Sequence, residues 1–296
     1  MTALERGIAW DFPFEPAHLL DTERYPIQDI SSTKTQNTIR QVKSQLREDG
    51  CAVIANFLSA DGLSQLLAEA QERRPLAYFS TQKKTNVYFS EDDPALPLSH
   101  PRRIFLNRIN GFVPSDCYDK ATASRTLFQW PALKRFIQEC LSKTSLHQYA
   151  DPVAVMPINV LTPGGQFNWH FDTNEFTITL LLKGAEQGGH FEYAPNLRNE
   201  SDERYDDVAA VLAGDTSHVK RLDLKADDLQ LFLGRFSLHQ ITPNTGATDR
   251  LVLIMSFAEK PGMIGSLTRT KELYGKVADA HIQAHQHHVR ADKLLD

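Results

Sequence analysis

The chain has 296 residues, of which 41% are hydrophobic and 23% are charged, and its formal net charge is -5 at pH 7. This composition is typical of a soluble globular protein and excludes a collagen-like fibre, a coiled-coil rod and a disordered chain. The mild acidity gives no electrostatic reason to bind nucleic acid or an anionic membrane.

The cysteines and the apolar runs indicate where the protein works. Its three cysteines, Cys51, Cys117 and Cys140, are far apart and form no CxxC pair, which argues against a disulfide scaffold or a thiolate zinc site. No apolar run approaches the roughly 20 residues of a membrane helix, and the first residues lack a secretory signal. We therefore expect a cytoplasmic protein without a membrane partner. The sequence leaves its oligomeric state open, with a homodimer as one alternative.

The first half of the chain is predicted to be mainly helical. Residues 1–32 favour an irregular arm, and a helix is expected over 35–47, with Gly50 as its stop. A strand-like run covers residues 51–57, and a second helix follows Ser59, its candidate cap. Residues 76–120 favour loops and short strands, and a third helix is expected over 123–141.

The pattern changes after residue 149, where several short apolar runs follow one another without helices between them. These runs are VAVMPINVLTP, FTITLLLKG, HFEYAP, LQLFLG and RLVLIMSF. Successive short strands predict a sandwich or barrel. The polar segment 195–222 is long enough to be a lid, and the chain is expected to be helical after residue 268. We thus expect one α+β domain over 1–296, with a helical part (1–148), a β core (149–268) and a C-terminal helix (269–296).

The motif NWHFD carries the chemistry. Residues i and i+2 of a strand project to the same side, so His170 and Asp172 can present a nitrogen and an oxygen to one metal ion. His239 follows 69 residues later, after the run LQLFLG. Two histidines and one carboxylate form the facial triad of non-haem Fe(II) oxygenases. Arg250, at the start of the next run, suits a two-pronged pair with a carboxylate such as that of 2-oxoglutarate.

The stretch from about residue 157 to residue 274 resembles the Fe(II)/2-oxoglutarate-dependent oxygenase superfamily. The segments NWHFDTNEFTITLLL, GGHFEYAPNLR and GRFSLHQITPNTGATDRLVLIMSF are similar to its branch of free-amino-acid hydroxylases and halogenases. The resemblance implies a double-stranded β-helix of the jelly-roll, cupin-like type. It also implies that His170, Asp172 and His239 bind iron and that Arg250 anchors 2-oxoglutarate. O2 would be the further co-substrate, and ascorbate would assist.

One residue separates the two reaction types of that branch. Its halogenases carry a small residue in place of the carboxylate, which opens a site for chloride, whereas this chain has Asp172. We therefore expect a hydroxylase for a free amino acid or a related biosynthetic intermediate. The sequence leaves open whether the product is an alcohol, an alkene or a ring. The alternatives are a peptide or protein hydroxylase with the same site and a non-catalytic, cupin-like metal-binding protein.

Further residues are candidates for substrate contacts. They are two arginines upstream, two aromatic residues and a threonine in or beside the NWHFD motif, and an arginine near His239: Arg103, Arg108, Phe167, Trp169, Thr173 and Arg235. By default Arg198 and Arg204, in the 195–222 segment, are expected to be solvated. The C-terminal His281, His285 and His288 fall on one helical face, for which we expect exposure to solvent.

Overall fold

A computed structural model describes residues 15–118, 121–284 and 294–295 of the chain. Its first long helices form where the sequence predicts them. Helix α1 (Thr33–Asp49) ends at Gly50, whose φ of 62° is a left-handed conformation that glycine adopts without strain. Helix α2 (Ala60–Arg73) begins after Ser59, whose hydroxyl accepts a hydrogen bond from the Gly62 amide.

The third predicted helix is two helices, so the prediction of one helix over 123–141 was wrong. Helix α3 (Ala123–Gln129) ends before Trp130, and α4 (Pro131–Cys140) begins with Pro131. Trp130 has ψ of 120°, an extended conformation, because a proline ring crowds the backbone of the residue before it. The break lets both helices turn their apolar faces to the same sheet.

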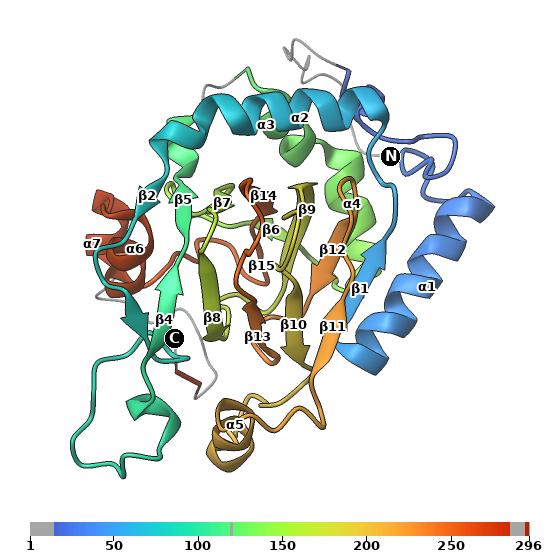
Figure 1. The fold of residues 1–296 in the computed structure, drawn as a ribbon. Coiled ribbons are helices and arrows are strands. Elements are labelled where there is room, and N and C mark those ends of the chain that lie inside the picture. The colour runs from blue at the N-terminus through green and yellow to red at the C-terminus, as the bar shows by residue number, and fades with distance from the viewer. Residues whose placement is uncertain (1–14, 119–120, 285–293, 296) are drawn as a thin grey trace.

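Two antiparallel sheets face each other and form the β core (Figure 1). The larger sheet has the strand order β1-β12-β9-β14-β7-β5-β2. Its strands are, in that order, Cys51–Ile54, Leu229–Phe232, Thr177–Lys183, Arg250–Met255, Ile158–Leu161, Gly111–Val113 and Tyr78–Phe79. The outer strands of this sheet therefore come from the first half of the chain.

The smaller sheet has the order β11-β10-β13-β8-β4-β3. Its strands are Lys220–Leu222, Phe191–Ala194, Leu238–Ile241, Gln166–His170, Leu106–Ile109 and Lys84–Thr85. A separate pair joins β6 (His147–Gln148) to β15 (Phe257–Ala258). The predicted α+β architecture, a double-stranded β-helix with a helical N-terminal part, is confirmed, although the N-terminal part also extends both sheets.

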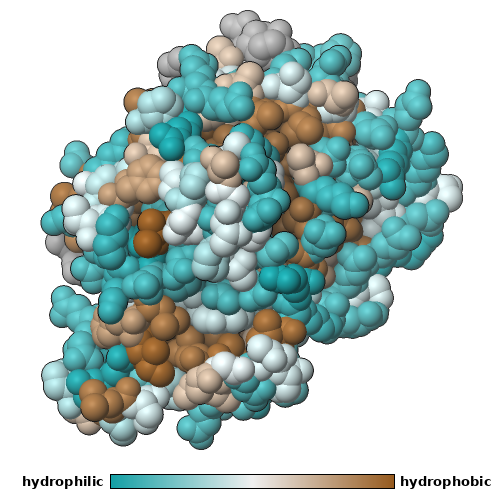
Figure 2. Space-filling view, viewed as in Figure 1, coloured by the Kyte–Doolittle hydropathy of each residue, from teal (hydrophilic) through white to brown (hydrophobic). Residues whose placement is uncertain are grey.

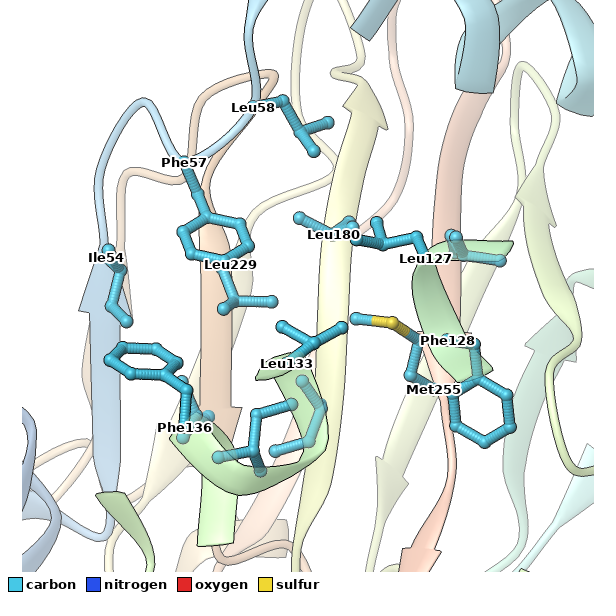
Figure 3. Packing of buried hydrophobic residues seen from close by; sticks show 14 of the residues in the cluster. Ile54, Phe57, Leu58, Leu127, Phe128, Leu133, Phe136, Leu180, Leu229 and Met255 are labelled. Carbon is cyan, nitrogen blue, oxygen red and sulfur yellow. The ribbon is translucent and has the colours of Figure 1, made fainter. Parts of the chain in front are cut away.

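The main apolar core lies between the larger sheet and the helices that cover its outer face. Figure 3 shows side chains of α3 and α4, among them Leu127, Leu133 and Phe136, against Leu180, Leu229 and Met255 of the sheet. All of them are 3% exposed or less. This packing makes the larger sheet a rigid wall for whatever lies between the two sheets.

Two further groups of elements surround the β core. Helix α5 (Tyr205–Leu212) lies within the 195–222 segment, next to the smaller sheet. Helices α6 (Leu267–Tyr274) and α7 (Asp279–Ala284) follow the last strand and lie beside β2 and β5 (Figure 1). In the part of the chain that the structure describes, no helix combines the length and the apolar character needed to cross a membrane.

The surface carries mostly hydrophilic residues in the view of Figure 2. Hydrophobic residues gather in the lower part of this face, where Figure 1 shows α5 and the loop that follows β3. Ring contacts join the two segments, because His100 of that loop lies 4.4 Å from Tyr205 of α5 between ring centroids. The two segments therefore pack together at the edge of the smaller sheet.

Candidate metal centre and adjoining cavity

Three potential metal ligands meet between the sheets. His170 ends β8, Asp172 follows it in a turn, and His239 lies on the neighbouring β13, directly opposite His170. Oδ1 of Asp172 lies 3.5 Å from Nε2 of His239 and 3.9 Å from Nε2 of His170. The three donor atoms lie within 4.8 Å of one another, close enough to bind one ion.

The backbone orients both imidazole rings. Nδ1 of His170 is 2.7 Å from the carbonyl oxygen of Asn168, and Nδ1 of His239 is 3.0 Å from that of Ser237. A carbonyl oxygen only accepts, so each Nδ1 carries the proton and donates it. The Nε2 lone pairs are thereby left to bind a metal, which is the usual arrangement for metal-binding histidines.

Asp172 is held by two residues that sequence analysis missed. Thr177 donates its hydroxyl proton to Oδ2 of Asp172 at 2.7 Å, which leaves Oδ1 for the metal. Gly234 lies against the same carboxylate, and its carbonyl oxygen accepts a hydrogen bond from the Asp172 amide at 3.0 Å. No local pattern marks Thr177 or Gly234, because both act across the turn rather than along one element.

The site favours a neutral His170 and a charged Asp172 carboxylate. Burial holds the pKa of His170 well below its ordinary value, and neighbouring His239 acts in the same direction. Burial works against the charge of Asp172, but the two histidines and the Thr177 hydroxyl outweigh it and hold the pKa of that carboxyl below its usual range. These protonation states are the ones that bind a divalent transition metal ion.

An irregularity in β8 decides which aromatic residue faces the centre. His239 pairs with His170 but Ile241 pairs with Phe167, so β8 has one residue more than β13 between these positions. This bulge turns Phe167 to the cavity together with His170, and their ring centroids are 3.8 Å apart. Trp169, a predicted substrate contact, does not line this cavity and packs with the α5 side of the sheet.

Arg250 lies on the inner side of the larger sheet and lines the same cavity. It is 5% exposed, and burial lowers the pKa of its guanidinium to about 10. Among the described residues no carboxylate lies within ion-pair distance of it. Polar side chains of the same cavity wall include those of Asn159, Thr179 and Gln230. A buried cation that faces a cavity fits a carboxylate ligand such as the far end of 2-oxoglutarate.

The cavity has a volume of about 170 Å³ and reaches from Arg250 to the three ligands and on to α6. Sequence analysis missed the α6 wall, which contributes Arg269, Thr270, Leu273 and Tyr274. About half of the other lining residues are aromatic or aliphatic: Phe112, Tyr149, Ala154, Pro157, Phe167, Phe191, Phe232, Ile241, Val252 and Ile254. The space between metal centre and α6 therefore suits a small molecule with apolar C–H groups.

The structure separates the predicted substrate residues. Thr173 lines the cavity, and its carbonyl oxygen accepts a hydrogen bond from the buried Arg235, which stands behind it. Arg108 is 2% exposed and does not line the cavity; its guanidinium lies over the ring of Phe89. Arg103 is not brought to the cavity, because it pairs with Asp92 in the loop after β3.

Two residues expected in solvent are buried. Arg198 is 2% exposed and forms an ion pair with Glu203 at 2.8 Å, whereas Arg204 is partly exposed, as expected. His281 is 1% exposed and lies 2.8 Å from the fully buried carboxylate of Asp151, which lines the cavity. The expectation of a solvent-exposed helix was therefore wrong at His281, and His285 and His288 lie outside the described residues.

Comparison with known proteins identifies a family and related folds. A family model described as Halogenase D matches residues 33–274. Among solved structures, the epimerase SnoN, solved with Fe3+, alpha ketoglutarate and nogalamycin RO, is 15% identical with a TM-score of 0.53, over 83% of this chain and 93% of its own. AviO1 from Streptomyces viridochromogenes Tue57 is 16% identical with a TM-score of 0.51, over 78% and 97%. No curated protein sequence matches the chain.

Proposed function

The chain belongs to the Halogenase D family, within the Fe(II)/2-oxoglutarate-dependent oxygenases, and we propose that it hydroxylates an unactivated C–H bond of a small molecule. The substrate is a free amino acid or a related natural-product intermediate. Fe(II) and 2-oxoglutarate are the cofactors. The proposal rests above all on Asp172, a carboxylate that stands with two histidines where a halogenase needs a vacancy for its halide.

The surroundings of Asp172 support hydroxylation over halogenation. Its Oδ1 faces the two Nε2 atoms, and Thr177 and Gly234 hold the carboxylate in that orientation. A charged oxygen ligand in this place contributes the third protein bond to iron and repels a halide anion. Three protein ligands leave the remaining coordination positions for co-substrates.

The chain's own residues supply binding, orientation and exclusion of water. Arg250 pairs with the distal carboxylate of 2-oxoglutarate, and the apolar rings around the ligands keep bulk water away. When bound with O2, Fe(II) and 2-oxoglutarate would supply the oxidising power, with succinate and CO2 as the products of the co-substrate. Thr173 and Phe167 line the space beside the iron ligands in which the reacting C–H group is positioned.

The cavity wall also supports a substrate that bears a carboxylate. Arg269 contributes a buried guanidinium to the wall, and the guanidinium groups of Arg269 and Arg108 both lie over the Phe89 ring. Buried positive charge favours an anionic group on a ligand. An amino acid bound in this way presents its carboxylate near α6 and its side chain to the iron ligands.

Product analysis tests the proposal. Purified protein is incubated in chloride-rich buffer with Fe(II), 2-oxoglutarate, ascorbate, O2 and a panel of free L-amino acids. Succinate and product masses are then measured, with His239→Ala as the inactive control. We expect one class of amino acid to stimulate succinate formation and to gain one oxygen atom.

The other outcomes contradict the proposal in distinct ways. A chlorinated product from the wild-type protein would overturn the argument from Asp172. Turnover with a peptide panel but not with free amino acids would favour a peptide hydroxylase. Stoichiometric iron binding without substrate-stimulated succinate would favour a non-catalytic, cupin-like metal-binding protein.

A further inference from the structure

The turn that carries Asp172 is not part of either sheet. Strand β8 ends at His170 and β9 begins at Thr177, so residues 171–176 have no ladder of backbone hydrogen bonds. The backbone contacts that remain at its start are few, namely Phe171 to Val87 and Asp172 to Gly234. A metal ligand on such a turn needs side chains from elsewhere to hold its position.

Arg198 contacts this turn from the α5 side. Its guanidinium carbon lies 3.9 Å from the ring centroid of Phe171, the residue between two metal ligands. The ring is held on another side by Tyr88, whose ring is stacked at 5.8 Å. The negative face of an aromatic ring attracts a guanidinium, and the attraction is stronger when both groups are out of water.

Arg198 also reaches the other side of Asp172. Its Nε donates to the carbonyl oxygen of Arg235 at 2.6 Å, and Nη1 of Arg235 donates to the carbonyl oxygen of Thr173 at 2.9 Å. One side chain is thus linked to the residue before Asp172 and, through Arg235, to the residue after it. A displacement of Arg198 would be transmitted to the carboxylate from both directions.

A fixed ion pair holds Arg198 itself. Nη1 donates to Oε2 of Glu203 at 2.8 Å, and the same nitrogen lies 3.3 Å from the carbonyl oxygen of Leu295. The amide of Leu295 donates to the other oxygen of Glu203. Two residues of the 195–222 segment and the backbone near the C-terminus therefore form one buried cluster, in which Arg198 and Leu295 are 97 residues apart in the chain.

We infer that Arg198 is a positioning residue for the iron ligand Asp172, and that Glu203 and Leu295 keep Arg198 in place. The 195–222 segment then does more than cover the smaller sheet. It sets the orientation of the carboxylate that binds iron. The inference rests on the metal site of the proposed function but not on the reaction carried out there.

Iron binding provides the test. Fe(II) affinity is measured without O2 for the wild-type protein, Arg198→Met and Glu203→Gln, together with the visible absorption of the Fe(II) complex with 2-oxoglutarate. Methionine keeps apolar volume at the buried site without a charge. Arg204→Met is the matched control, because Arg204 is a neighbouring arginine that pairs only with Asp207 among the described residues. Far-UV circular dichroism monitors folding.

We expect Arg198→Met to weaken Fe(II) binding about 10- to 100-fold, the range for residues that orient a metal ligand, and to shift the absorption band. Arg204→Met should match the wild type in both measurements. Glu203→Gln and deletion of residues 294–296 should each weaken Fe(II) binding several-fold, since they loosen Arg198 without removing it. If Arg198→Met does not fold, Glu203→Gln and the deletion test the positioning role of Arg198 in its place.

Two results separate failure of this inference from failure of the proposed function. If wild-type protein binds Fe(II) and a folded Arg198→Met binds it equally well with the same absorption band, the positioning role is wrong. Unchanged Fe(II) affinity in both Glu203→Gln and the deletion would likewise overturn the role given to Glu203 and Leu295. If the wild-type protein binds no Fe(II), the proposed function fails first.

Discussion

Gly234 approaches Asp172 so closely that a Cβ atom at Gly234 would lie 2.0 Å from Oδ2 of the carboxylate. No side chain is compatible with that distance, so the iron ligand and the glycine depend on each other. The contact joins the turn after β8 to the turn before β13. It explains why a glycine is needed at a position that carries no unusual φ angle.

Gly234→Ala should therefore displace the Asp172 carboxylate and weaken Fe(II) binding by at least tenfold, a typical effect of disturbing the support of a metal ligand. Anaerobic Fe(II) titration measures it. Gly184→Ala is the matched control, because a Cβ at Gly184 meets nothing within 4 Å. Equal Fe(II) affinity in the two variants would mean that the contact between Gly234 and the carboxylate does not affect Fe(II) binding.

Thr177→Val should weaken Fe(II) binding about 10- to 100-fold, because the valine has the shape of threonine but cannot donate to Oδ2 of Asp172. Thr177→Ser keeps the hydroxyl and should recover most of the affinity. The same titration distinguishes the two variants. If valine and serine behave alike, the hydroxyl does not orient the carboxylate.

Arg250→Lys should weaken 2-oxoglutarate binding much more than it lowers the free energy of unfolding. Lysine keeps the charge but loses the two-pronged geometry. Loss of a charge-assisted pair worth about 1.5–3 kcal/mol corresponds to a roughly 10- to 150-fold weaker affinity. Calorimetric titration of the iron-loaded protein with 2-oxoglutarate measures the change, and an unchanged dissociation constant would place the anchor elsewhere.

Asp172→Gly should abolish most hydroxylation, because it removes the charged oxygen ligand that completes the iron site. It also opens the position that halogenases leave to chloride. Mass spectrometry of products formed in chloride-rich buffer, with the substrate found for the wild-type protein, measures both effects. Hydroxylation at the wild-type rate in this variant would mean that Asp172 does not bind iron.

The sequence alone predicted the three candidate metal ligands that the fold brings together. The i, i+2 spacing of His170 and Asp172 beside a strand predicts that both lie on one side, although in the structure Asp172 stands in the turn after the strand. The short apolar runs after residue 149 likewise determined the class of fold, since strands without helices between them must pair with one another. The end of α1 at Gly50 and the start of α2 after Ser59 are equally local.

The break between α3 and α4 is an intermediate case. The dipeptide Trp130-Pro131 was present as a signal, but the apolar spacing on both sides of it favoured one continuous helix. Steric crowding by the proline ring outweighed that periodicity. Pro131 by itself therefore marks the boundary between α3 and α4.

Only the tertiary structure decided the rest of the site. The bulge in β8 arises from pairing with β13, and it turned Phe167 rather than Trp169 to the cavity. Thr177 and Gly234 meet Asp172 through the folding of separate turns. Arg198 became buried because the 195–222 segment packs on the ring of Phe171. Contacts between distant segments leave no period in the sequence, so charge and polarity alone predicted solvent where the fold provides a partner.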